Sequence, residues 1–298
     1  MSQIHETISP SWGSLPIERY LLSKWHPSLD LSVDEQRLEL VKAFLKENDI
    51  SAFASISAEA ITTDKQELIQ TVLVPWRSQK LRRIAEKYDP RNPLFDTLVV
   101  LRTHYGGDSD ERFSRWIGDA CDAFDDMDPD GDLFGPPDER WWHVLDDASL
   151  FNIGSQEWQT VYTILPELAA SELRRDFNDD DVQEAKELVL SICDSREPEE
   201  DDYEDAICEI AKVGFWLIVV DKEAFENEEL LLVFIDKKGN VVRQTAIAPV
   251  DLPHLPHYIL RGSITESGFW RDAEVGKKYK TRGEIMCAAL PLVMAESE

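Results

Sequence analysis

The sequence predicts a mixed fold, α+β or α/β, in which a helical N-terminal region precedes two duplicated strand-helix-strand units, the second with a β-hairpin and a C-terminal helix. Apolar residues at helical spacing, a weak internal repeat and two apolar segments around a glycine turn support this prediction. At 298 residues the chain has the length of about two domains. The predicted parts are residues 1–95 (the helical region), 96–172 (the first unit) and 173–298 (the second unit with the hairpin and the final helix).

Residues 1–95 are expected to be mainly helical. Ser32 and Glu35 have the spacing of a capping box, which places a helix start at this serine. A second helix over about residues 64–74 should end at Pro75, because proline has no backbone N–H to donate. In the helix that begins at Ser32, the apolar face consists of residues at helical spacing: Leu38, Val41, Phe44 and Leu45.

A third helix is expected over residues 77–88, and it contains the main cluster of basic residues. This cluster lacks the interleaved aromatic side chains that stack on nucleic-acid bases. We interpret it as a solvent-exposed helix face, or as one that packs on the acidic middle of the same chain. Its members are Arg77, Lys80, Arg82, Arg83 and Lys87.

The first strand-helix unit begins with the apolar, β-rich segment 97–105, followed by two glycines and by a helix over about residues 109–124. The helix has one apolar stripe, at Phe113, Trp116, Ile117, Ala120, Cys121 and Phe124. Shifting the sequence by 72 residues gives five identities in 22 positions and a second stripe in the same phase. The identities pair Leu101 with Leu173, Arg102 with Arg174, Asp108 with Asp180, Cys121 with Cys193, and Asp122 with Asp194.

Further strands are expected after each helix, over residues 141–147 and 215–221, and each of them ends in aspartate. Residues 230–248 predict a β-hairpin, because two apolar strands flank a Lys-Gly-Asn turn. The proline-spaced segment 248–258 is expected to be a loop, and residues 284–294 a short apolar helix.

The net charge of −28 is concentrated in the middle of the chain. Residues 105–235 hold 37 acidic and nine basic residues, whereas the two signs balance over the rest. A local field of one sign indicates a cationic partner or a cation, although such blocks of charge are also often only solvating. Phosphate groups would be repelled, so we expect no direct nucleic-acid binding by this region.

No spacing matches a catalytic signature, so we expect a non-enzymatic interaction protein that binds or masks a basic partner through its central region. The partner would be a nucleic-acid-binding, histone-like or ribosomal protein, or a cationic toxin, and binding should weaken steeply with salt. Of two neighbouring tryptophans on a strand, one should be buried and the other should add apolar contact. The expected partner-binding residues are Asp122, Asp125, Asp126, Asp128, Asp130, Asp132, Trp141, Trp142, Asp179, Asp180, Asp181, Glu199, Glu200, Asp201 and Asp202.

The segment 126–139 has the D-x-D-x-D-G start of a calcium-binding loop, with Gly131 at the sharp turn. Pro137 stands where a bidentate glutamate closes such a loop, so the last ligand would have to come from one of the next two residues. A plain solvated turn is the competing interpretation, because aspartates are frequent throughout this region. The candidate Ca²⁺ ligands are Asp126, Asp128, Asp130, Asp132 and Glu139.

Three other kinds of site stay open. Asp146 and Asp147, at a strand end, would suit magnesium-dependent phosphoryl chemistry, but no motif supplies the nucleophile and the lysine that such chemistry needs. His254 and His257 are spaced as two metal ligands and need a third. A small apolar ligand between the two units, with the charge serving solubility, is the third hypothesis.

We expect an intracellular protein, cytoplasmic or nuclear. The first ten residues lack the charged start and apolar core of a signal peptide, and no apolar run approaches the roughly 18 residues of a membrane span. The four cysteines form no C-x-x-C pair, which favours buried thiols in a reducing compartment.

Overall fold

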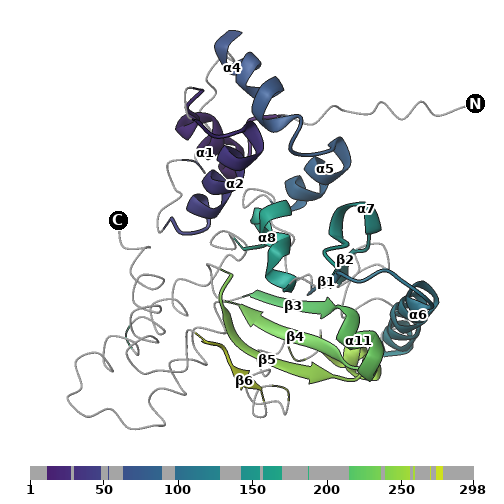
Figure 1. Ribbon diagram of the computed structural model, residues 1–298. Helices are drawn as coiled ribbons and strands as arrows, with labels where there is room; N and C mark the ends of the chain where they lie inside the picture. Colours follow the sequence, from purple (N-terminus) through teal and green to yellow (C-terminus); the bar gives the residue numbers. More distant parts are fainter. Residues whose placement is uncertain are drawn as a thin grey trace, which may run out of the picture.

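The computed structural model describes residues 12–27, 30–47, 53, 63–88, 98–127, 142–154, 157–169, 187, 215–235, 239–255, 258, 269 and 273–277. For residues 124–127 and 215 it describes the backbone alone. These ranges form a mixed α and β fold built on one six-stranded sheet (Figure 1).

Six strands form the sheet: β1 (Leu98–Arg102), β2 (Trp142–Leu145), β3 (Phe215–Val220), β4 (Leu230–Ile235), β5 (Val241–Ile247) and β6 (Glu274–Val275). Their order is β2-β1-β3-β4-β5-β6. β1 lies between β2 and β3 and runs parallel to both, whereas from β3 onward each strand is antiparallel to the next. The sheet is therefore mixed, and β4 and β5 are the predicted hairpin.

The described α-helices are α1 (Pro16–Lys24), α2 (Val33–Phe44), α4 (Thr63–Leu68), α5 (Gln79–Lys87), α6 (Ser109–Met127), α7 (Ala148–Phe151), α8 (Val161–Ile164) and α11 (Lys222–Asn227). Short π and 3-10 segments accompany them: η1 (Ile69–Leu73), η3 (Trp158–Thr160), η4 (Pro166–Leu168) and η5 (Pro249–His254). In Figure 1 the helices α1, α2, α4 and α5 group together at the top, and α6 and α11 group at the right of the sheet.

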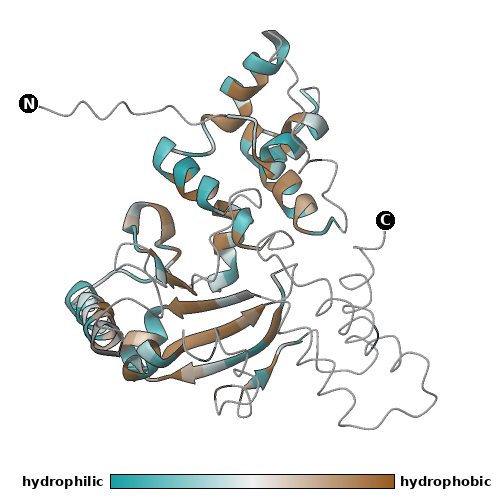
Figure 2. Cartoon of the chain, turned by 180° about the vertical axis from the view of Figure 1, so that it is seen from behind, coloured by the Kyte–Doolittle hydropathy of each residue, from teal (hydrophilic) through white to brown (hydrophobic). Residues whose placement is uncertain are grey.

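Apolar side chains cover both faces of the sheet, whose central strands are brown in Figure 2. On one face, Val100, Ile218 and Leu232 pack with residues of α6, α11 and η5. On the other face, Val99 and Leu217 pack with residues of α1, α2, η1, α5, α7 and α8. Alternate residues of a strand point to opposite faces, so a strand covered on both sides must be apolar throughout. The N-terminal helices therefore share a core with the sheet.

The N-terminal helices follow the predicted boundaries closely. The Ser32 hydroxyl accepts the Glu35 N–H, and the Glu35 carboxylate accepts the Ser32 N–H at 3.0 Å, which confirms the capping box at the start of α2. α4 continues as η1 up to Leu73, two residues before Pro75. Leu38 is 40% exposed, so the buried face of α2 is narrower than predicted.

Only part of the basic cluster at α5 is solvent-exposed: Lys80, Arg83 and Lys87 are exposed, whereas Arg77 and Arg82 are buried. Arg77 donates two hydrogen bonds to the Glu167 carboxylate, at 2.7 and 3.0 Å, and its guanidinium lies over the Trp76 ring. Arg82 is paired with Glu18, whose side chain is also buried. Buried charges need such partners because their removal from water is costly. Glu167 belongs to the acidic middle of the chain. The contact of Arg77 with it therefore agrees with the second interpretation of the cluster, in which it packs on this acidic region.

Glu18 also organises the start of α1. One of its carboxylate oxygens accepts the backbone N–H groups of residues 13–15, at 2.8, 3.1 and 3.3 Å. Burial raises the pKa of Glu18, while the guanidinium groups of Arg82 and Arg77 act in the opposite direction. One carboxylate thus serves both as the counter-charge of a buried arginine and as the acceptor for three N–H groups that α1 cannot satisfy itself.

The predicted duplication is only partly within the described residues. β2 and β3, which the repeat makes equivalent, both run parallel to β1 and flank it. The residues that would repeat β1 and α6, about 170–194, lie outside the described ranges except for residue 187, and so does the predicted helix at 284–294. The coarser prediction, a mixed α and β fold, is what the structure shows.

The segment after β5 forms the 3-10 helix η5 where a loop was predicted. Pro249 occupies the first helical position, where its missing N–H costs nothing. The Asp251 carboxylate accepts the Ala248 N–H at 3.2 Å, which closes the start of the helix. The prolines that suggested a loop are thus compatible with one short helix.

Gly239, in the turn between β4 and β5, has a φ of +71°, in the left-handed region. A Cβ at this position would lie 2.8 Å from the Cβ of Ala169 and 3.1 Å from the Tyr162 ring. The Tyr162 hydroxyl donates to the Gly239 carbonyl at 3.3 Å. Glycine is therefore required both by the backbone conformation and by the contact of the hairpin with the segment after β2.

Candidate functional site

Most of the predicted partner-binding residues lie outside the part of the chain that the structure describes. Asp122 is exposed on α6, and the backbones of Asp125 and Asp126 continue this helix to its end. Trp142 is 9% exposed and packs in the core, so it is not presented to a partner as predicted. The predicted residues outside the description are Asp128, Asp130, Asp132, Glu139, Trp141, Asp179, Asp180, Asp181, Glu199, Glu200, Asp201 and Asp202.

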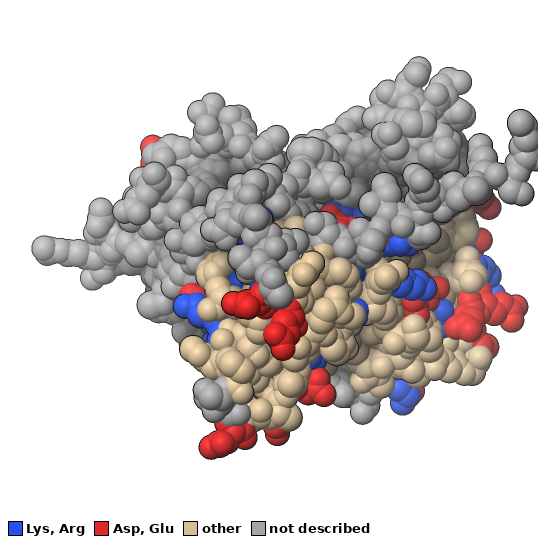
Figure 3. Space-filling model, turned by 90° about the horizontal axis from the view of Figure 1, so that it is seen from above, with Lys and Arg blue, Asp and Glu red and all other residues tan. Residues whose placement is uncertain are grey.

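Eight of the exposed carboxylates that the structure describes lie on or directly after α6 and α11. These helices are neighbours: the rings of Trp116 and Phe225 stack at 5.3 Å, and Arg112 forms an ion pair of 3.1 Å with Glu228. Figure 3 shows red side chains at its right-hand edge, the side on which α6 lies in Figure 1. We define the acidic face as the exposed carboxylates on and directly after these helices: Asp110, Glu111, Asp119, Asp122, Glu223, Glu226, Glu228 and Glu229.

Much of the acidic face is not neutralised by described residues. Arg115 and Lys222 are the exposed bases on the same two helices. The paired members are Asp110 with Arg102, Glu226 with Lys222, and Glu228 with Arg112. The members that form no ion pair with any described residue are Glu111, Asp119, Asp122, Glu223 and Glu229.

The acids at the C-terminal end of α6 do not stabilise the helix. A helix dipole favours basic residues in the last turn, and the last turn of α6 has none. Asp119, Asp125 and Asp126 each lie three or four residues from Asp122, a spacing at which like charges repel. Helix stability therefore does not account for this concentration of aspartates, whereas binding of a cationic partner would.

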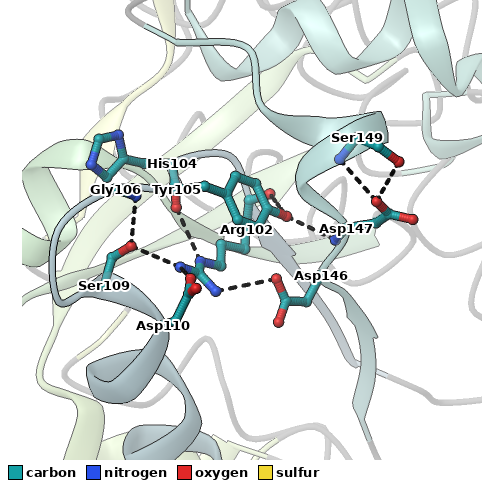
Figure 4. A network of polar contacts seen from close by, with 9 residues as sticks. All are labelled: Arg102, His104, Tyr105, Gly106, Ser109, Asp110, Asp146, Asp147 and Ser149. Atoms are coloured by element: carbon teal, nitrogen blue, oxygen red, sulfur yellow. Dashed lines mark hydrogen bonds and ion pairs between the residues drawn. The ribbon is translucent and has the colours of Figure 1, made fainter.

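Arg102, the last residue of β1, fixes the start of α6 (Figure 4). It is 2% exposed, and its guanidinium donates to the His104 carbonyl at 3.0 Å and to the Ser109 hydroxyl at 2.8 Å. It also pairs with the carboxylates of Asp110 and Asp146. All three guanidinium nitrogens thus have partners within the chain. This arginine holds the acidic face in place and is not presented to an anionic ligand.

Tyr105 ties the same loop to the end of β2. Its hydroxyl donates to the Arg102 carbonyl at 3.1 Å and accepts the Asp147 N–H at 2.8 Å. Burial, and after it the Asp146 carboxylate, raise the pKa of Tyr105, so the hydroxyl keeps its proton to a higher pH than an ordinary tyrosine does. The turn that precedes α6 is therefore fixed by an arginine and by a tyrosine.

The strand-end aspartates considered for magnesium are engaged by the chain itself. Asp146 pairs with Arg102. Asp147 caps α7 by accepting the N–H and the hydroxyl of Ser149, at 2.9 and 2.7 Å, and it pairs with Lys80. The contacts with Lys80 and then Ser149 hold the pKa of Asp147 below its usual value. These contacts favour a structural role, and within the described ranges no group of three or more potential metal-ligating side chains lies together.

A groove of about 380 Å³ lies beside the acidic face, between α6 and η5. Val250 borders it and is 74% exposed. Asp119 and Glu228 of the acidic face, together with Arg115, also border it. Its apolar lining comes from Trp116, Ala120, Ala123, Ala248, Pro249, Val250 and Pro253.

Sequence reasoning missed Arg102, the groove and the acids of α11. An arginine at the end of an apolar strand is a signal that could have been used, because such a residue needs buried partners. The groove had no such signal, since it exists only where η5 packs near α6. Glu223 and Glu229 lie within the acidic middle of the chain, but nothing in their spacing places them beside α6.

No protein-family model, curated protein or solved structure matches this chain. None of the helices in the described ranges combines the length and the apolar character needed to cross a membrane. The geometry of the acidic face and of the groove is therefore the basis for a proposed function.

Proposed function

We propose that this protein binds a basic partner protein through the acidic face of α6 and α11. The observation that supports this most directly is the set of five carboxylates on the face that form no ion pair with a described residue. Such charges create a local negative potential, which attracts and orients a cationic protein. The aspartates at the end of α6 favour the same proposal, because they weaken the helix on which they lie.

The sign of this potential limits the chemistry of the partner. A surface rich in lysine and arginine finds its counter-charges here, whereas the phosphates of free nucleic acid are repelled. Nucleic-acid-binding, histone-like and ribosomal proteins have such surfaces, and so do cationic toxins. Masking a basic surface needs no chemical step. Binding without catalysis also fits the engagement of Arg102 and the strand-end aspartates by the chain itself.

The support of the acidic face is rigid, which favours binding. The contacts of Arg102 fix the first turn of α6, and the stacked rings of Trp116 and Phe225 join α6 to α11. A surface that is already ordered loses little conformational entropy when a partner docks. The affinity of the acidic face then depends mainly on how well the partner matches its charges.

The test compares two variants with the same change in net charge. Basic proteins are captured from cell lysate on the wild-type protein at low salt, purified, and titrated against all three proteins. The control removes four exposed carboxylates from the N-terminal helical region: Asp30→Asn, Glu39→Gln, Asp64→Asn and Glu67→Gln. The test variant removes four from the acidic face: Glu111→Gln, Asp119→Asn, Asp122→Asn and Glu223→Gln.

The test variant should bind at least about fourfold more weakly than wild type, since exposed ion pairs contribute roughly 0.2–1 kcal/mol each. The control variant should bind like wild type, and high salt should weaken binding of the wild-type protein. Equal losses in both variants, or binding that does not respond to salt, would contradict the proposal. Capture that a chelator abolishes would instead support the calcium loop at residues 126–139.

A further inference from the structure

We infer that the groove between α6 and η5 takes an apolar side chain from the partner, on a segment that also bears lysine or arginine. The inference rests on the proposed function and adds the kind of segment that the acidic face binds, which is a basic amphipathic one.

The groove exposes apolar surface that the described residues do not cover. Among them, Val250 is the most exposed large hydrophobic side chain, at 74%. On the other side of the groove, Ala120 and Ala123 give α6 a wall of small side chains next to Trp116. Apolar surface that is concave and bordered by charges is typical of a protein-binding site, because covering it removes that surface from water.

The groove has a suitable size and a fixed wall. Its volume of about 380 Å³ is near the lower end for ligand pockets, and it suits one or two large side chains better than a cofactor. The Trp116 ring contacts two groups: the Phe225 ring, whose centroid lies 5.3 Å away, and the Arg112 guanidinium, which lies 5.2 Å from the Trp116 centroid. This wall is therefore in place before a partner arrives, which lowers the cost of binding.

The charges at the border select a basic segment. Asp119 and Glu228 lie at the border, and Asp119 forms no ion pair with a described residue. Arg115 is the one base among the described residues that line the groove. A side chain that enters the groove is therefore best followed or preceded by lysine or arginine.

The inference can be tested with two labelled peptides and the full-length protein. One probe is a short lysine–serine peptide with a single central leucine, and the matched probe has serine in place of that leucine. Binding is measured by fluorescence anisotropy at low salt. Two protein variants change the groove without changing its charge: Val250→Ser removes exposed apolar surface, and Ala123→Leu fills part of the volume.

We expect wild type to bind the leucine peptide at least about tenfold more tightly than the serine peptide, because the leucine is buried. Both variants should lose this preference while keeping the affinity for the serine peptide. Equal affinities in the wild type, or a preference that neither variant changes, would overturn the inference. In that case, salt-dependent binding of both peptides, lost in the four-carboxylate variant of the acidic face, would leave the proposed function standing. If neither peptide binds at low salt, both proposals fail.

Discussion

Replacing Asp122 with asparagine should make the protein more stable, although a carboxylate is lost. Asp122 is exposed and lies three or four residues from Asp119, Asp125 and Asp126 in a helix whose last turn has no base. Each like-charge pair at this spacing costs about 0.2–0.5 kcal/mol, so the three pairs together cost about 1 kcal/mol. Asparagine has nearly the same shape and helix propensity. We therefore expect the free energy of unfolding to rise by about 1 kcal/mol.

The same substitution at the other end of α6 should have the opposite effect. Asp110 is in the first turn, where the helix dipole favours a negative charge, and it pairs with the buried Arg102. Asp110→Asn should therefore lower the free energy of unfolding by about 1 kcal/mol or more. The two variants change the net charge equally, so a difference in sign must come from position within the helix.

Urea unfolding, followed by tryptophan fluorescence and far-ultraviolet circular dichroism, measures both variants against the wild-type protein. The gain in Asp122→Asn should shrink at high salt, because the Debye length falls to about 3 Å at 1 M. A variant that is less stable than wild type, or a gain that high salt leaves unchanged, would refute the electrostatic reasoning about α6. The unfavourable aspartates would then no longer support the proposed function.

Three further predictions concern other parts of the fold. Glu167→Gln should lower the free energy of unfolding by about 3 kcal/mol or more, because it leaves the buried Arg77 without its counter-charge; a loss below about 1 kcal/mol in urea unfolding would contradict this. Glu228→Gly should raise the free energy of unfolding by about 0.5 kcal/mol, because glycine tolerates the φ of 56° and the exposed ion pair that is lost contributes little; a less stable variant in the same assay would count against it. The ionised Asp147 should stabilise the fold above its unfolded pKa of about 4, and this stabilisation should be lost as the pH falls through its lower folded pKa. Asp147→Asn should therefore flatten the acid side of a profile of unfolding free energy against pH. An unchanged profile would show that the contact of Asp147 with Lys80 does not stabilise the protein.

Local signals predicted the elements that depend on a few neighbouring residues. The capping box at Ser32 and Glu35 needs only two side chains at a fixed spacing, and it is present in the structure. The stripe on α6 was equally local, and Phe113, Trp116 and Ala120 of this stripe lie in the core with residues of the sheet. The hairpin around Gly239 followed from its turn residues. In each case the physical cause and the sequence pattern cover the same short segment.

Features that join distant segments could not be predicted in the same way. The basic cluster allowed two interpretations, because nothing near Arg77 in the sequence shows that its partner is Glu167, 90 residues away. The predicted acidic region contains the acidic face, but only the packing of Trp116 on Phe225 brings α6 and α11 together. The groove needs η5 to return to α6 after four strands. Charge and periodicity therefore predicted that the protein has an acidic surface. Which elements form this surface depends on the tertiary packing.

The sheet order has a consequence for the synthesis of this protein. β1 pairs with β3, which begins at Phe215, and Arg77 pairs with Glu167. When the N-terminal helices leave the ribosome, neither the strand that completes their core nor this carboxylate has yet been made. The apolar faces of these helices and the charge of Arg77 therefore stay in contact with water for most of the translation time. During this time the nascent chain can bind chaperones or aggregate. The N-terminal third of this protein is therefore made first and completes its folding late.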